Sequence, residues 1–277
     1  MAAGGESPDY TFEAFAQHDF YRAVNEQLVD VTLQLRDRLA QSPIRRVLDL
    51  ACGTGAVTQL LVERVRRLRE PVEIIGLDPS DSALEKARRL VGNAAAFVRG
   101  TAQAFSSMVN GVDVILFCNA IHLLPDKDCV VSEAHKALNS DGVLGFNTSF
   151  YDGCYTVGTE GFYRLWMQRA RQALKETGLR PDRSKVEAMR WLTKEEYRDL
   201  VERHGFQVEY MQEDQALMTC QSWQDISHYT DFVNGALPGV PVDVAIPILQ
   251  NAVVQAYDEL GISELPRNWL QVVARAV

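Results

Sequence analysis

The order of apolar and amphipathic stretches between residues 45 and 150 constrains the fold more than any other feature of the sequence. The apolar runs RRVLDLA, VEIIGLD and VDVILFCNA have the length and composition of strands. Between the first two lies AVTQLLVERVRRL, in which Val57, Leu61 and Val65 recur at helical spacing. Strands that alternate with helices indicate a parallel sheet covered on both faces, and near-continuous apolar runs fit strands buried on both sides. The predicted fold class is α/β, with a doubly wound, mostly parallel sheet.

The stretch VLDLACGTGA, residues 47–56, has a carboxylate near the end of the first predicted strand, followed by small residues and two glycines. In an open parallel sheet, ligands bind beyond the carboxyl ends of the strands, so Asp49 is expected at a ligand crevice. Gly53 and Gly55 allow a sharp turn and a close approach of the backbone to a ligand. A carboxylate beside a bare loop suits a polar ligand with a positively charged part, such as the ammonium of an amino acid.

A second carboxylate, Asp78, ends the next predicted strand. An acidic residue at that point can accept hydrogen bonds from both hydroxyls of a ribose. The structural alternative is that Asp78 caps the helix predicted to start near Ser80. A dinucleotide loop of the form GxGxxG/A is disfavoured, because Thr58 stands at its sixth position and because the carboxylate of Asp49 does not help to bind a diphosphate.

Composition narrows the functional classes further. The 277-residue chain has a formal net charge of −9 and a pI near 5.1, which disfavours nucleic acid as a partner. Its five cysteines form no CxxC or Cys/His ligand cluster, so we expect free thiols in a reducing compartment and no metal site. The sequence shows neither a secretory signal pattern nor an apolar stretch long enough to span a membrane. The expected location is cytoplasmic.

Taken together, these motifs resemble those of class I S-adenosylmethionine-dependent methyltransferases. VLDLACGTG is similar to the first motif of that family, IGLDPSDSALEKAR to its second, and VILFCNAIHLL to its fourth. LNSDGVLGF is similar to the glycine turn before the fifth strand. VRGTAQAF departs from the family pattern, since Thr101 replaces the acid that would meet the adenine amine.

The resemblance implies a role for each motif residue. Asp49, Gly53 and Gly55, with Ala51 between them, would hold the methionine end of S-adenosyl-L-methionine. Asp78 would hold the ribose. The remaining cofactor contacts would come from Pro79, near the adenine, and from Thr101, Ala102 and Asn119, through backbone or polar groups.

The resemblance also implies a Rossmann-like sheet of seven strands with an antiparallel last strand. The expected organisation is an N-terminal helical cap at 1–40, a cofactor-binding core at 41–150, a helical substrate cover at 151–192, and the end of the sheet at 193–277 with a helical insertion at about 221–260. The oligomeric state is left open.

His122 is the candidate catalytic base, because it follows the fourth predicted strand, where the transferred methyl group should point. An imidazole suits the removal of a proton from a hydroxyl or an acidic carbon. A packed, hydrogen-bonded histidine is the structural alternative. His18 and His228 are rival bases from the predicted cover segments.

Aromatic residues gather in the segments outside the predicted sheet. Five of them are candidates for the acceptor pocket: Tyr21, Phe150, Tyr151, Tyr163 and Trp166. Ordinary helix packing explains any single one of these, but the group favours a small, largely apolar acceptor in an enclosed pocket.

The predicted function is methyl transfer from S-adenosyl-L-methionine to oxygen or carbon of a small, largely apolar metabolite of secondary metabolism. Such a transfer is an in-line displacement, in which proximity and alignment supply much of the barrier reduction. Three alternatives stay open: a cofactor-binding cyclase or rearrangement enzyme on the same fold, a nicotinamide-dependent oxidoreductase, and a noncatalytic binding partner.

Overall fold

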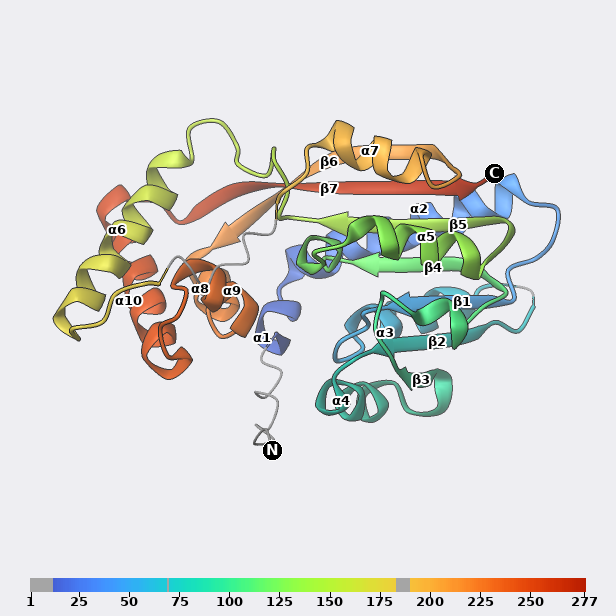
Figure 1. Cartoon of the computed structure of the whole chain (residues 1–277), viewed down its shortest axis with the longest axis horizontal. Coiled ribbons are helices and arrows are strands. Elements are labelled where there is room, and N and C mark those ends of the chain that lie inside the picture. Colours follow the sequence, from blue (N-terminus) through green and yellow to red (C-terminus); the bar gives the residue numbers. More distant parts are fainter. Residues whose placement is uncertain (1–11, 69, 183–189) are drawn as a thin grey trace. The chain divides into compact units, whose positions relative to one another are not determined.

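The computed structural model in Figure 1 describes residues 12–68, 70–182 and 190–277. The chain divides into two compact units, which we call the sheet unit and the helical unit. The sheet unit consists of Ala23–Cys154, Met189–Asp214 and Trp269–Val277. The helical unit consists of Met1–Arg22, Tyr155–Ala188 and Gln215–Asn268. Each is described by itself.

Seven strands form one sheet in the order β3-β2-β1-β4-β5-β7-β6 (Figure 1). The strands are β1 (Arg46–Leu50), β2 (Glu73–Asp78), β3 (Ala96–Arg99), β4 (Val112–Cys118), β5 (Leu138–Thr148), β6 (Phe206–Thr219) and β7 (Glu264–Ala276). β1 to β5 pair in parallel, and β7 pairs with β5 in antiparallel orientation. The predicted doubly wound, seven-stranded sheet with an antiparallel last strand is confirmed.

Helices cover both faces of this sheet. They are α2 (Asp19–Leu39), α3 (Ala56–Val65), α4 (Asp81–Val91), α5 (Lys127–Ala137) and α7 (Lys194–Glu202), with short 3₁₀ turns η1 (Gly92–Ala94), η2 (Phe105–Ser107) and η3 (Ile121–Leu123). Successive side chains of β4 point to opposite faces, as the period of two in a strand requires. Ile115 and Phe117 pack with α5 and α7, whereas Val114 and Leu116 pack with α2 and α3.

Local sequence signals begin and end several of these elements. Ser80 caps α4, since its hydroxyl accepts a hydrogen bond from the backbone N–H of Ala83. Thr193 and Glu196 form a capping box at the start of α7. The expected turn NSDG, residues 139–142, is included in β5, but the pairing of β4 with β5 is irregular there and Asp141 has a φ of 61°. The four residues therefore interrupt the ladder without ending the strand.

The helical unit contains α1 (Glu13–Ala16), α6 (Glu160–Glu176), α8 (Cys220–Ile226), α9 (Thr230–Ala236) and α10 (Val242–Leu260). α6 and α10 form its most extensive helix–helix contact. Aromatic side chains fill its core: Phe162 packs against Trp166, Trp223 and Tyr257 with ring centroids 5.2–6.0 Å apart. Such rings supply much of the apolar area that a small helical unit can bury.

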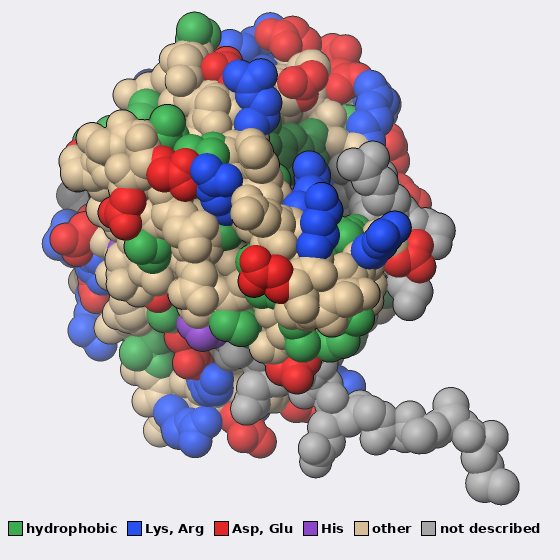
Figure 2. All heavy atoms as spheres, turned by 90° about the vertical axis from the view of Figure 1, so that its left-hand side faces the viewer, with side chains coloured by type: hydrophobic (Ala, Val, Ile, Leu, Met, Phe, Trp, Pro, Cys, Tyr) green, Lys and Arg blue, Asp and Glu red, His purple; other side chains and the backbone are tan. Residues whose placement is uncertain are grey.

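On the face drawn in Figure 2, Lys and Arg side chains lie among Asp and Glu side chains. Mixed charge of this kind gives local fields of both signs rather than one strong field. Among the helices of the described residues, none is both long enough and apolar enough to cross a bilayer.

Candidate active site

The loop after β1 turns sharply with three residues in the left-handed region of backbone space. Ala51, Gly53 and Gly55 have φ values of 56°, 52° and 90°. Gly55 is also the N-cap of α3, and a Cβ built on it would lie 3.0 Å from the Cβ of Ala87 in α4. Glycine is therefore required at position 55 for two reasons, its φ and the close approach of α4.

Asp49 lies in β1 with only 1% of its surface exposed. Its Oδ2 accepts a hydrogen bond of 2.6 Å from the hydroxyl of Thr58 in α3. Burial raises the pKa of Asp49 from 3.8 to about 7, the Thr58 hydrogen bond opposes the rise, and the nearby charge of Asp78 adds to it. Within the described residues Asp49 pairs with no Lys or Arg.

Asp113, at the opposite edge of the same sheet, is a buried carboxylate with several hydrogen-bond donors and can be compared with Asp49. Asp113, at the start of β4, accepts hydrogen bonds from the backbone N–H groups of Arg45 and Arg46 and from the side chains of Asn139 and Arg36. Burial pushes the pKa of Asp113 upward, but these four donors outweigh it and the pKa is lowered. Asp49 accepts hydrogen bonds from the neutral Thr58 and from no cationic group among the described residues, so its environment is suited to a cationic ligand rather than to an unliganded carboxylate.

Asp78 ends β2 and is 6% exposed. Its Oδ2 accepts a hydrogen bond of 3.0 Å from the backbone N–H of Gly53, and its Oδ1 accepts one of 2.9 Å from the backbone N–H of Ser80. Burial raises the pKa of Asp78 against the lowering effect of both bonds. Asp78 thus ties the glycine loop to the end of β2, a contact that sequence reasoning did not find. Since each carboxylate oxygen has a second lone pair, it can still accept from a hydroxyl.

The predicted adenine contacts follow β2 and β3. Pro79 and Thr101 are exposed, whereas Ala102 is buried at 8% exposure. The backbone N–H of Gly100 donates to the carbonyl of Asp78 at 3.1 Å, which joins the two strand ends. These three positions lie at the same carboxyl edge as Asp49 and Asp78, because β1, β2 and β3 run in parallel.

Asn119 follows β4 with a φ of 48°, a conformation that Asn tolerates better than most residues. Its backbone N–H lies 2.8 Å from Oδ1 of the fully buried Asn147, whose Nδ2 donates to Asn25 in α2 at 2.9 Å. Asn119 Oδ1 accepts from the backbone N–H and the hydroxyl of Ser149 at 3.2 and 3.3 Å. The loop after β4 is therefore fixed against the end of β5 by side-chain amides.

His122 lies in η3, three residues after Asn119, and is 7% exposed. Its Nδ1 is 3.0 Å from Oγ1 of Thr148, the last residue of β5. Its ring packs against Phe150 with centroids 4.5 Å apart, and Phe150 in turn contacts Trp191. The structure thus places this imidazole at the same strand edge as the two carboxylates.

The five predicted pocket aromatics fall into both units. In the sheet unit, Phe150 is half-buried, whereas Tyr151 is fully buried in the core and its hydroxyl donates to Glu213 at 2.7 Å. In the helical unit, Tyr21 is buried and Tyr163 accepts a hydrogen bond from Arg267. The third aromatic of the helical unit, Trp166, donates from its indole to the carbonyl of Leu249. Their contact with an acceptor stays a prediction.

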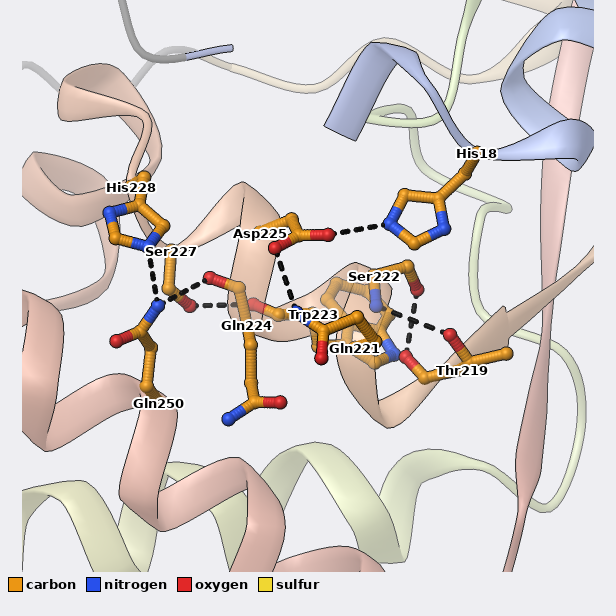
Figure 3. Close-up of polar contacts among 10 residues, drawn as sticks. All are labelled: His18, Thr219, Gln221, Ser222, Trp223, Gln224, Asp225, Ser227, His228 and Gln250. Carbon is orange, nitrogen blue, oxygen red and sulfur yellow. Dashed lines mark hydrogen bonds and ion pairs between the residues drawn. The ribbon is translucent and has the colours of Figure 1, made fainter. Parts of the chain in front are cut away.

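The rival histidines lie in the helical unit around α8 (Figure 3). His18 Nε2 is 2.8 Å from Asp225 Oδ2, and Gln221 donates to the other oxygen of that carboxylate at 2.9 Å. His228 Nε2 is 2.7 Å from Nε2 of Gln250. Because an amide nitrogen only donates, His228 Nε2 accepts, and the proton of the neutral ring is on Nδ1. Each rival ring is therefore held by a polar neighbour within its own unit.

These residues fit the cofactor that the sequence motifs implied. The ammonium of a methionine tail would supply the cationic partner that buried Asp49 needs. Ribose hydroxyls are donors that match the remaining lone pairs of Asp78. The described residues contain no group of three or more His, Cys, Asp or Glu side chains arranged to hold a metal ion.

Part of the sequence is similar to known proteins. A family model described as a methyltransferase domain matches residues 47–142. The chain is 33% identical over 109 residues to an uncharacterized methyltransferase of Mycobacterium tuberculosis, covering 39% of this chain and 42% of that protein. It is 38% identical over 118 residues to a trans-aconitate 2-methyltransferase of Rhizobium leguminosarum, covering 41% of this chain and 43% of that protein.

The chain thus spans less than half the length of these two relatives. The fold also matches a crystal structure of a putative methyltransferase from Bacillus halodurans, with a TM-score of 0.54 and 16% identity over 87% of this chain and 96% of that one. At that identity the likeness concerns the fold alone. Residues 47–142 therefore match a methyltransferase-domain model in the region where the sequence motifs resemble that family.

Proposed function

We propose that the protein transfers a methyl group from S-adenosyl-L-methionine to oxygen or carbon of a small, largely apolar metabolite. The observation that carries this proposal is the pair of buried carboxylates, Asp49 and Asp78, at the ends of two adjacent parallel strands. One has a pKa raised to about 7 and lacks a cationic partner among the described residues. The other holds the glycine loop and keeps lone pairs for two hydroxyls.

Each residue has a definite task in this proposal. Asp49 binds the ammonium of the methionine tail, and the bare backbone at Gly53 and Gly55 lets that tail approach closely. Asp78 accepts hydrogen bonds from the ribose. When bound, S-adenosyl-L-methionine supplies an electrophilic methyl group on a good leaving group, so the protein contributes mainly position and alignment.

The name of one relative, a trans-aconitate 2-methyltransferase, supports a small acceptor. We place His122 beside the acceptor, because it follows β4 at the edge that carries both carboxylates. Phe150 packs on the His122 ring, and we propose that it contributes the apolar contact to the acceptor from the sheet unit.

Isothermal titration calorimetry with S-adenosyl-L-methionine tests the proposal. Wild type should bind, and Asp78→Asn should bind about tenfold or more weakly, because an amide cannot accept from both backbone donors and both hydroxyls. Asp81→Asn is the matched control. It removes the same charge from a nearby position, where the exposed Asp81 pairs with Arg99. Equal binding by wild type and Asp78→Asn would count against the proposal.

Two further measurements on the wild-type protein distinguish the alternative functions. Titration with NAD and NADH tests the nicotinamide-dependent oxidoreductase, which should bind those ligands and should not bind S-adenosyl-L-methionine. Formation of S-adenosylhomocysteine during turnover distinguishes methyl transfer from a cyclisation that leaves the cofactor intact.

A further inference from the structure

Lys127 carries its positive charge at a place in the sheet unit where a cation is costly. It is the first residue of α5, and only 8% of its surface is exposed. Burial disfavours the charged form of an amine, and the positive end of the helix dipole lies at this end of α5. Burial lowers the pKa of Lys127, and no charged group of the described residues offsets that effect.

The two acids beside Lys127 in the sequence do not neutralise it. Asp126 is the N-cap of α5, and its Oδ1 accepts a hydrogen bond of 2.9 Å from the backbone N–H of Cys129. The two oxygens of Asp128 accept hydrogen bonds of 2.7 and 2.9 Å from the guanidinium of Arg203. Successive residues of a helix point in different directions, so neighbours in the sequence need not be partners. Both carboxylates are therefore engaged elsewhere.

A single neutral acceptor holds the ammonium group of Lys127. Its Nζ donates to the backbone carbonyl of Leu124 at 2.8 Å. An ammonium has three donors, so two remain, and the part of the chain that the structure describes offers no further acceptor to them. An uncharged side chain of similar length could cover the same apolar surface without the cost of burying a charge. This arrangement suits an anion that comes from outside the chain.

Lys127 also lies on the loop that carries His122. The carbonyl that Lys127 binds belongs to Leu124, the residue that ends η3, two positions after His122. Consecutive Cα atoms are about 3.8 Å apart, so the Cα atoms of His122 and Leu124 are separated by at most about 7.6 Å. An anionic group bound by Lys127 would therefore lie within the length of a small molecule from the His122 loop.

We infer that Lys127 is a specificity-determining residue, whose ammonium group binds an anionic group of the acceptor, a carboxylate or a phosphate. The inference deepens the proposed function and rests on it for the identity of the reaction, whereas binding of an anion can be measured without any reaction. The anionic group serves recognition, because it fixes one end of an otherwise apolar molecule. The acceptor class thereby narrows from apolar metabolites in general to those that carry an ionised acid.

Calorimetry at pH 7 with three phenyl compounds tests the anion site. Benzoate and phenyl phosphate carry the two kinds of anion, and benzamide is the neutral counterpart of benzoate. Wild type should bind at least one of the anions about tenfold or more tightly than benzamide, as expected for a hydrogen bond to a charged group. The tighter of the two identifies the anion. A wild type that binds neither anion more tightly than benzamide overturns the inference without any variant.

Two variants locate the group that binds the anion. Lys127→Met keeps the length of the side chain without the charge, and Lys127→Gln also keeps an N–H donor for the Leu124 carbonyl. Both should lose the preference for the anion, by about tenfold or more. Lys136→Met is the matched control, because the exposed Lys136 lies in the same helix and pairs with Glu133, and it should bind like wild type.

The same variants test a purely structural role for Lys127, in which the ammonium group only closes the turn at Leu124. Anion binding by Lys127→Gln that equals wild type would overturn the inference. The urea midpoint of Lys127→Met should not fall at pH 7, since this variant buries no charge. A lower midpoint together with unchanged anion binding would identify the structural role instead.

Titration of S-adenosyl-L-methionine into the same wild-type samples separates the two proposals. If wild type prefers an anion to benzamide but does not bind S-adenosyl-L-methionine, the proposed function fails and the anion site stands. If wild type binds S-adenosyl-L-methionine and prefers neither anion, only the role of Lys127 fails.

Discussion

The Asp49→Asn variant should stabilise the unliganded protein while it removes cofactor binding. Asp49 is 1% exposed and has a pKa of about 7, against 3.8 for the ordinary value. Because the folded-state pKa is raised, the folded chain keeps a proton that the unfolded chain releases between these two pH values. Wild-type stability therefore falls as pH rises from about 3.8 to about 7, and Asn, which never ionises, avoids this cost.

The magnitude follows from the two pKa values. At about 1.4 kcal/mol for each pH unit, the difference corresponds to about 4 kcal/mol at pH 8, and to nearly nothing below pH 4. Urea unfolding of unliganded wild type and Asp49→Asn at several pH values between 4 and 8 measures it. The advantage of the variant should grow through this window and then level off.

Asp113→Asn is the matched control from the opposite edge of the sheet. The pKa of Asp113 is lowered, so its contribution is present at neutral pH and is lost as the pH falls. This variant should be less stable than wild type at pH 8, by a margin that shrinks in acid. A pH-independent difference for Asp49→Asn, or a variant less stable than wild type at pH 8, would refute the view that Asp49 is an unpaired buried acid awaiting a cation.

Three further predictions concern the residues around this centre. Thr58→Val removes the hydrogen bond that lowers the pKa of Asp49, so calorimetry should show weaker binding of S-adenosyl-L-methionine at pH 7 and a smaller deficit at pH 9, where the carboxylate is ionised regardless; an equal deficit at both pH values would contradict this. Gly55→Ala should lower the free energy of unfolding by about 1–3 kcal/mol, because alanine is strained at a φ of 90° and meets α4; urea unfolding measures it, and a neutral result would mean that α4 moves away easily. Arg36→Met leaves Asp113 without its buried cation and should cost about 3–5 kcal/mol in the same assay, where a change under 1 kcal/mol would show that the remaining donors suffice.

Much of the fold follows from signals that act within a few residues. The near-continuous apolar run of β4 distinguished it from the helices around it, whose apolar residues recur every three or four positions, because a strand buried on both faces needs apolar side chains at every position. Ser80 caps its helix through Ala83, where the sequence predicted the helix to start. The order of these elements was enough to predict a doubly wound sheet, since a parallel pair of strands needs a helical crossover.

The candidate site was only partly accessible from the sequence. Motif positions brought Asp49, Asp78 and His122 to one strand edge, because parallel strands share their carboxyl ends. Nothing local indicated that Asp78 binds Gly53 or that Asn119 is held by Asn147, since these partners are separated by 25 and 28 residues. Such contacts depend on strand register, which the chain acquires only when the sheet assembles.

By itself, then, the amino-acid order determined which segments become strands, where the chain turns, and which acidic and basic groups end the strands. Tertiary structure alone decided the chemical state of those groups. Burial raises the pKa of Asp49, which accepts from the neutral Thr58, to about 7, whereas Asp113, with four donors that include Arg36, has a lowered pKa. The same residue type in the same sheet differs because desolvation and hydrogen bonding are properties of the folded surroundings, not of the side chain.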